Sequence, residues 1–111
     1  MKIYITACNK YTHICPTALE CLNNHWPNQD ITIVGYESVK ELKNLPDNVD
    51  VEFLGKQQDF GESWTTALIP CFQDVPEDYF VILLEDLIIM SPMDMKRIDA
   101  LENQIRQGNA Q

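Results

Sequence analysis

The sequence has few basic residues, and its long apolar stretch is interrupted by acids. Eight Lys and Arg stand against 17 Asp and Glu in 111 residues, which gives a formal net charge of −9. Surfaces that bind nucleic acid or anionic membranes need clustered Lys and Arg, so neither is expected as a partner. The longest apolar stretch, residues 79–93, carries Glu85 and Asp86 in its middle, so no membrane span is expected.

Glycine and cysteine are also sparse, with four of each. The glycines form neither G-x-G-x-x-G nor G-x-x-x-x-G-K, which removes the main support for a dinucleotide-binding or P-loop protein. No two cysteines form a C-x-x-C pair, which argues against a structural zinc site. The apolar run at the N-terminus is too short for a signal peptide, so a reduced, cytoplasmic protein is expected.

What the sequence does have is an alternation of strand and helix patterns. Strands are predicted over residues 3–7, 31–35, 49–53 and 79–84, and helices over residues 14–26, 38–42, 62–72 and 92–108. This order predicts one α/β domain over residues 1–111, with an open, doubly wound, mainly parallel sheet and helices on both faces. The most economical strand order is 3-2-1-4.

Finer expectations concern coverage and helix ends. The continuously apolar strand 79–84 is typical of a strand buried on both faces, whereas the alternating strand 49–53 indicates a sheet edge with one wet face. Thr12 or Cys15 is expected to cap the first long helix. Ser38 to Glu41 has the form of a capping box.

The last helix is expected to begin after a cap at Ser91, with Pro92 in its first turn. Its apolar positions predict a buried face. These positions are Met95, Ile98, Leu101 and Ile105.

A strand order of 3-2-1-4 predicts where a ligand would bind. Ligands of such sheets lie outside the carboxyl ends of the strands at which the winding reverses, here the first and the fourth. The residues at those ends are Thr6, Ala7, Cys8, Asn9, Glu85 and Asp86. Two acids after a buried strand face desolvation and mutual repulsion unless a cation or hydrogen-bond donors neutralise them. An Mg²⁺ or Mn²⁺ ion that bridges a carboxylate to a phosphate would neutralise them. The alternative is that both acids lie in a solvated loop or cap backbone donors.

Other residues allow both a functional and a structural interpretation. Cys8 with His13 could form a nucleophile, although a small buried cysteine is the commoner role. Trp64 could stack on a ligand ring or pack in the core. Glu37 could accept a hydrogen bond from a nucleobase or a ribose. It could equally be an acid that stabilises the start of a helix through the helix dipole. Lys10 could help to hold phosphate.

Three segments together resemble the GT-A fold glycosyltransferases of bacteria and phages, which have a Rossmann-like sheet. The first is Ala7-Cys8-Asn9-Lys10-Tyr11-Thr12, followed by a helix that closes on His25-Trp26-Pro27. The second is Trp64 before an apolar helix. The third, YFVILLEDLIIMSPMD over residues 79–94, is similar to the family's strand, acidic DxD-like metal motif and continuation.

The resemblance implies a site for a nucleotide-diphosphate sugar, such as a UDP- or GDP-sugar. The turn from Thr6 to Cys8 and Glu37 would hold the nucleoside, and Asp86, with Glu85, would bind Mn²⁺ or Mg²⁺ on the diphosphate. The family's enzymes are longer, and their second half supplies the acceptor pocket. The resemblance therefore implies a truncated, donor-binding half in which sugar transfer is incomplete.

Two other classes remain open. One is a non-catalytic α/β module that binds a nucleotide or a protein partner, and the other is a thiol protein based on Cys8. Without a second half, the strand 79–84 or the run 87–90 would stay uncovered, which would favour self-association.

Overall fold

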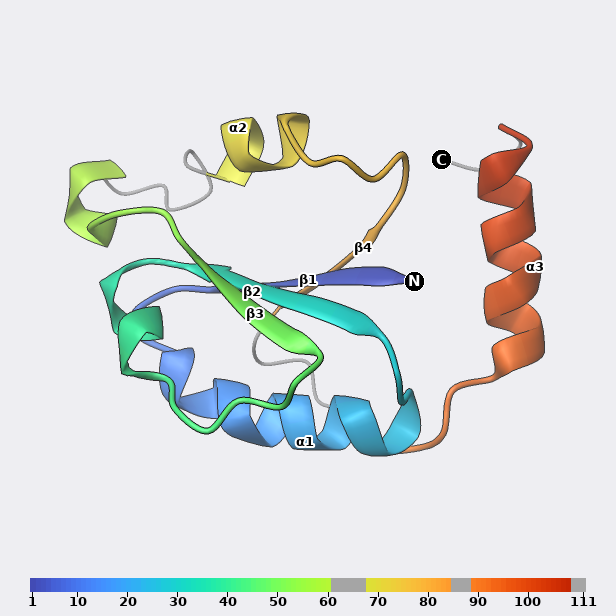
Figure 1. Cartoon of the computed structure of the whole chain (residues 1–111), viewed down its shortest axis with the longest axis horizontal. Coiled ribbons are helices and arrows are strands. Elements are labelled where there is room, and N and C mark those ends of the chain that lie inside the picture. Colours follow the sequence, from blue (N-terminus) through green and yellow to red (C-terminus); the bar gives the residue numbers. More distant parts are fainter. Residues whose placement is uncertain (61–67, 85–88, 109–111) are drawn as a thin grey trace.

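The computed structural model describes residues 1–60, 68–84 and 89–108. Its centre is a sheet of four parallel strands in the order β3-β2-β1-β4, which confirms the predicted fold class and strand order (Figure 1). The strands are β1 (Lys2–Ala7), β2 (Asp30–Gly35), β3 (Val49–Phe53) and β4 (Val81–Leu84). β1 is central, pairing with β2 on one side and with β4 on the other.

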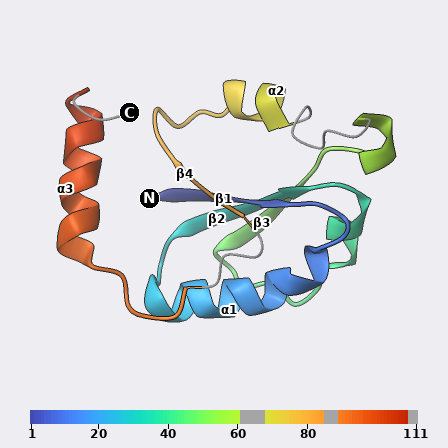
Figure 2. The same ribbon diagram turned by 180° about the vertical axis from the view of Figure 1, so that it is seen from behind.

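The described residues form three α-helices: α1 (Cys15–His25), α2 (Leu68–Gln73) and α3 (Met95–Arg106). Short 3₁₀ helices follow the carboxyl ends of three strands: η1 (Thr12–Ile14), η2 (Glu37–Glu41) and η3 (Gln57–Phe60). Figures 1 and 2 show α1 and α2 on opposite faces of the sheet, while α3 stands beside the end at which β1 begins.

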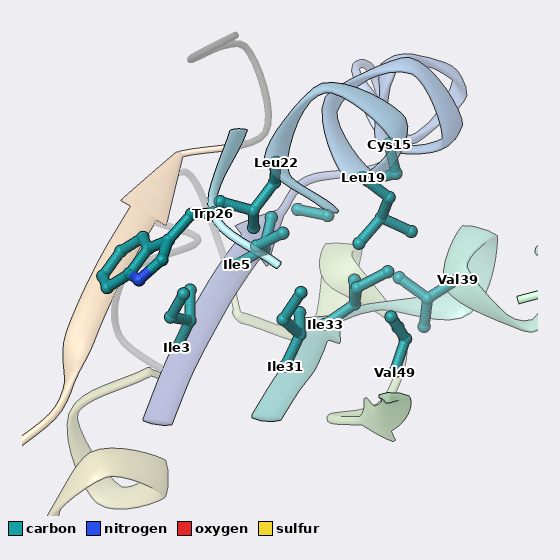
Figure 3. Close-up of a cluster of buried hydrophobic side chains, with 11 residues drawn as sticks. Ile3, Ile5, Cys15, Leu19, Leu22, Trp26, Ile31, Ile33, Val39 and Val49 are labelled. Atoms are coloured by element: carbon teal, nitrogen blue, oxygen red, sulfur yellow. The ribbon is translucent and has the colours of Figure 1, made fainter. Parts of the chain in front are cut away.

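The face of the sheet under α1 holds the larger core (Figure 3). Successive strand residues point to opposite faces, so alternate residues of β1 and β2 meet the apolar stripe of α1. The strand residues include Ile3, Ile5, Ile31 and Ile33, and the helix contributes Cys15, Leu19 and Leu22, with Trp26 just beyond its end. Each of them is at least 95% buried.

The opposite face holds a smaller cluster beneath α2, built on Tyr4, Val34 and Leu68. The Tyr4 ring meets the rings of Phe72 and Phe80 edge-on, with centroids 5.2 Å apart in both pairs. The Tyr4 hydroxyl donates a hydrogen bond to Glu77. The described part of α2 therefore packs over β1 and β2.

β4 corrects the expectation of a strand covered on both faces. Val81 and Leu83 pack against the core under α1, but Ile82 and Leu84 are 49% and 45% exposed. β4 is the edge strand of the described sheet, and the cluster beneath α2 does not extend to Ile82 and Leu84. An unbroken apolar run does not reveal whether a helix covers the second face.

β3 lies at the other edge, as expected, but it does not have one dry face. Only Val49 is buried, and Val51 and Phe53 are 37% and 44% exposed. The ammonium group of Lys40 lies 3.8 Å from the centroid of the Phe53 ring, so a cation covers part of that ring. The alternation therefore predicts the edge position of β3 correctly, but the amphipathic character it predicts is wrong.

Two expected side-chain caps do not form. α1 follows η1 directly, its N-cap is Ile14, and no side chain caps it. Pro16 lies in its first turn. No capping box forms at η2, because the Ser38 hydroxyl contacts the Thr12 hydroxyl at 2.5 Å instead.

α3 begins later than predicted, because Asp94 rather than Ser91 is its cap. The Asp94 carboxylate accepts from the backbone N–H groups of Lys96 and Arg97 at 3.1 and 3.2 Å. It satisfies two of the otherwise unpaired N–H groups at a helix start.

The predicted buried face of α3 is wrong, since the helix contains no buried residue. Ile98 and Ile105 are half-buried, while Met95 and Leu101 are 45% and 56% exposed. An amphipathic pattern creates an apolar stripe, but long-range packing decides whether the stripe is covered.

A polar cluster ties α3 to the segment before β4. The Tyr79 hydroxyl donates to Glu102 and accepts from Arg106 Nε, both at 2.8 Å, and Arg106 pairs with Glu102 at 2.7 Å. The hydrogen bond from Tyr79 is the main reason why the pKa of Glu102 is lowered.

None of the described helices is long and apolar enough to cross a membrane.

Candidate functional site

The carboxyl ends of all four strands meet at one edge of the sheet, because the strands are parallel. The winding reverses between β1 and β4, whose last pair is Thr6 with Leu84. This is the position at which ligands bind open α/β sheets. Glu85 and Asp86 follow Leu84 in the sequence, and they lie outside the described residues, as does Trp64.

The end of β1 is more closed than expected. Thr6, Ala7 and Cys8 are between 1% and 8% exposed. The Cys8 carbonyl already accepts from the Tyr11 N–H and the Thr12 hydroxyl, each at 3.0 Å. The side chains of this turn therefore offer little to a ligand. The buried hydroxyl of Thr6 has no hydrogen-bond partner in the described parts of the chain.

Asn9, directly after this turn, joins the ends of three strands. Its side-chain amide donates to Glu37 Oε1, and its side-chain carbonyl accepts from the Ser38 N–H at 3.1 Å. Its own backbone N–H donates to Gln57 Oε1 at 2.7 Å. Because Glu37 and Ser38 follow β2 and Gln57 follows β3, Asn9 connects the strand ends into one polar cluster.

Glu37 is the predicted nucleoside residue that this cluster positions. It is exposed, and its Oε1 accepts from Asn9 and, at 3.3 Å, from the Gln57 N–H. Within the described residues its Oε2 accepts no hydrogen bond. One carboxylate oxygen is thus held by the protein, and the other is available to accept from a ligand hydroxyl or N–H.

A pocket of about 260 Å³ lies beside this cluster. Polar residues supply most of its lining, which consists of Asn9, Thr12, His13, Ser38, Glu41 and Leu42. A larger hollow of about 320 Å³ lies between α1 and the segment that precedes β3. The smaller pocket is the candidate site, because it lies at the carboxyl edge and its lining includes Asn9 and Ser38 of the cluster. Glu37 and Gln57 belong to the cluster but not to the lining of the pocket.

Lys10 does not join the cluster. It is exposed, and its ammonium group lies 5.4 Å from the centroid of the neighbouring Tyr11 ring. A phosphate role for Lys10 therefore stays a prediction.

No cation site is formed by the described residues alone. Within residues 1–60, 68–84 and 89–108, no three His, Cys, Asp or Glu side chains gather as metal ligands would. The predicted Mn²⁺ or Mg²⁺ site depends on Asp86 and Glu85, both outside those ranges.

The thiols of Cys8 and Cys71 sit in environments that favour a structural role. Cys8 is 8% exposed, and small buried cysteines usually act as packing groups. The Cys71 thiol donates to Glu52 at 3.4 Å. Burial, followed by the charge of Glu52, raises the pKa of Cys71 to about 11. A raised pKa lowers the thiolate fraction and hence the reactivity of the sulfur.

The sequence placed Asn9 at the carboxyl edge but did not indicate its bridging role. It did not indicate that Gln57 belongs to the site. The position of Asn9 directly after a strand was a signal for it. Gln57 carried none, because its contact with Asn9 spans 48 residues.

Comparison of the sequence with known protein families and with curated proteins finds no match. The fold itself defines the class: an α/β protein with an open, all-parallel, Rossmann-like sheet.

Proposed function

We propose that this protein binds a nucleotide-diphosphate sugar at the carboxyl edge of its sheet, as the donor-binding part of a glycosyltransferase. The observation that carries the proposal is the parallel pairing of β1 with β4, which ends at Thr6 and Leu84. The sequence continues from Leu84 into two acids, so they follow the strand at which the winding reverses.

Glu37 and Asn9 support a nucleoside at the adjacent strand ends. In Rossmann-like sheets, an acid near the second strand commonly accepts from ribose hydroxyls. Glu37 lies two residues after Gly35, the last residue of β2, and Asn9 holds only one of its two carboxylate oxygens. We propose that Glu37 Oε2 accepts from the ribose or the base.

The acidic composition is compatible with a diphosphate ligand if a divalent cation mediates the contact. A net charge of −9 would repel a diphosphate alone. We propose that Asp86, with Glu85, holds Mn²⁺ or Mg²⁺ against the diphosphate. The ion would offset the negative charge that develops on the diphosphate as the sugar leaves.

Calorimetric titration of the full chain with UDP and with GDP, with and without Mn²⁺, tests this proposal. We expect binding heat only when the metal is present. Asp86→Asn should weaken that binding by roughly tenfold or more, since it removes a charged metal ligand. Asp47→Asn is the matched control, because Asp47 is exposed and precedes β3 at the opposite edge of the sheet.

Two outcomes would reject the donor site. The first is no heat with either nucleotide under any metal condition. The second is equal binding by Asp86→Asn and the wild type. Thermal unfolding of both variants should match the wild type, which would exclude misfolding as the cause of a loss.

A non-catalytic interaction module is the second candidate. The specific observation in its favour is the exposure of Ile82 and Leu84, two large apolar side chains of β4. Its test is sedimentation equilibrium of the full chain without nucleotide, in which a mass above the 12.8 kDa of one chain would support self-association and a mass of one chain at every concentration would reject it.

A further inference from the structure

The backbone of β3 is hydrogen-bonded on one side, to β2. The bonds at the two ends of this ladder run from the Ile31 N–H to the Asn48 carbonyl, at 2.9 Å, and from the Leu54 N–H to the Gly35 carbonyl, at 2.8 Å. Alternate residues of a strand bond to the same neighbour, so the even-numbered residues of β3 bond to β2. The odd-numbered residues therefore direct their N–H and C=O groups away from the sheet.

Val51 and Phe53 carry these outward groups. β3 is the last strand on its side of the sheet (Figure 1), and within the described residues the outward groups of Val51 and Phe53 form no hydrogen bond. The side chains of both residues are exposed as well. An unpaired strand edge is a template on which a further strand can pair. The edge of β3 is therefore able to bind an extended chain.

The side chains of β3 separate charged from apolar surface. Asp50 and Glu52 lie on the face that carries α2, because the thiol of Cys71 in α2 donates to Glu52 at 3.4 Å. Val51 and Phe53 lie on the opposite face, since successive strand residues alternate. Residues that face each other in paired strands share a face. A chain added at this edge would therefore meet acids and apolar side chains at alternate positions.

The charges around this edge favour a basic partner. Neither Asp50 nor Glu52 forms an ion pair with another described residue. Lys2, on the same face, already pairs with a different acid at 3.2 Å. Lys40 lies on the opposite face, over the ring of Phe53. Basic side chains of a partner are therefore favoured on the face with the two acids, and apolar ones on the face with Lys40.

A second copy of this chain is not suited to the same edge. Two β3 strands that pair antiparallel through their outward groups would place Asp50 opposite Glu52 of the other copy. A shift by two residues would place Asp50 opposite Asp50, or Glu52 opposite Glu52. Like charges that face each other destabilise a strand pair. The acids therefore disfavour self-pairing and favour a partner of opposite charge.

We propose that the edge of β3 binds an extended segment of a partner protein in which Lys or Arg alternates with apolar residues. The segment adds a further strand to the sheet. Its backbone pairs with the outward groups of Val51 and Phe53, and its basic side chains lie beside Asp50 and Glu52. Backbone hydrogen bonds supply affinity in this mode of binding, and alternate side chains supply specificity.

Fluorescence anisotropy of the full chain with a labelled peptide of alternating Lys and Val tests the proposal. We expect the Lys–Val peptide to bind at least roughly tenfold more tightly than a peptide of alternating Glu and Val. Two further peptides carry N-methyl groups on the Val residues or on the Lys residues. A strand pairs through alternate residues, so one of these two should bind roughly tenfold more weakly than the unmethylated peptide, although its charge is unchanged.

Charge reversal in the chain locates the contact. Asp50→Lys combined with Glu52→Lys should reverse the preference, so that the Glu–Val peptide binds more tightly than the Lys–Val peptide. Glu20→Lys combined with Asp99→Lys is the matched control, because it changes the net charge equally and both residues are exposed, on α1 and α3. This control should keep the preference for the Lys–Val peptide. Circular dichroism checks that the variants fold, and the peptide comparisons on the unmodified chain need no variant.

Three results would overturn the proposal. The first is no binding of the Lys–Val peptide to the unmodified chain. The second is equal binding of the unmethylated peptide and both methylated ones, which would indicate attraction by charge alone. The third is a preference for the Lys–Val peptide that survives reversal of Asp50 and Glu52 in a folded variant. None of these measurements involves nucleotide or metal, so they are independent of the donor-site test.

Discussion

The side-chain amide of Asn9 donates a hydrogen bond to the carboxylate of Glu37, joining the end of β1 to the end of β2. The two residues are 28 positions apart in the sequence. This contact holds one carboxylate oxygen in place at the edge where the proposed ligand would bind. It therefore serves both the stability of the strand ends and the geometry of the candidate site.

Asn9→Ala should lower the free energy of unfolding by about 1–2 kcal/mol, since it removes two side-chain hydrogen bonds from a partly buried position. Urea denaturation measures the change. Asn24→Ala is the control, because Asn24 is exposed on α1 and alanine favours helix; it should be neutral or slightly stabilising. Equal stability of Asn9→Ala and the wild type would contradict the bridging role.

Gly35→Ala should destabilise the fold by about 1–3 kcal/mol, because a side chain at this position overpacks the end of β2. An added Cβ would lie 2.3 Å from Val39 Cγ1 and 2.9 Å from the Ala7 carbonyl oxygen. The second of these atoms is backbone in the paired strand and cannot easily move. Thermal or urea unfolding measures the loss.

Gly108→Ala provides the comparison, since nothing lies within 4 Å of its added Cβ. Its φ of +75° still disfavours alanine, so Gly108→Ala should cost only about 1 kcal/mol. A Gly35→Ala variant no less stable than Gly108→Ala would show that β1 and β2 are less tightly packed there than described.

Glu52→Gln should speed alkylation of Cys71 by iodoacetamide severalfold at mildly alkaline pH. Burial and the Glu52 carboxylate raise the pKa of Cys71 from 9.0 to about 11, so removing the charge restores part of the thiolate. Mass spectrometry of the labelled peptides measures the rate. Asp50→Asn, two residues earlier on β3, should have no effect, and equal acceleration by both variants would refute the specific contact.

The stability of the fold should fall as the pH rises above 10.0, partly because of Tyr4. Burial is the main cause that raises the pKa of Tyr4 above its ordinary value of 10.0, and its hydrogen bond to Glu77 adds to the shift. The folded state therefore keeps a proton that the unfolded state releases, so rising pH favours unfolding.

Tyr4→Phe removes the titrating hydroxyl, so the free energy of unfolding should fall less steeply with pH. The slope should decrease by up to the equivalent of one proton, about 1.4 kcal/mol per pH unit. The substitution keeps the ring contacts with Phe72 and Phe80. Urea denaturation at neutral pH and above pH 10.0 measures the difference. Tyr11→Phe is the control, as Tyr11 is 39% exposed, and it should have the same pH dependence as the wild type.

Much of the fold could be predicted from local patterns. The β-branched residues around Ile3 and Ile31 and the helical spacing of Leu22 and Trp26 gave the correct strands, the correct first helix and the correct strand order. The strand order then located the carboxyl edge, where Glu37 lies as predicted. The contacts that position Glu37 could not be predicted, because Asn9 and Gln57 reach it from distant parts of the sequence.

The sequence by itself determined which segments are strands and helices, because hydrophobic periodicity is a property of neighbouring residues. Only the tertiary structure decided which apolar faces are covered. Ile82 and Leu101 have the same apolar character as Ile31 and Leu22, yet the first two are exposed and the last two are buried. Burial depends on whether another element packs against a face. Which element packs there is determined by the tertiary arrangement of the whole chain, not by the residues of that face.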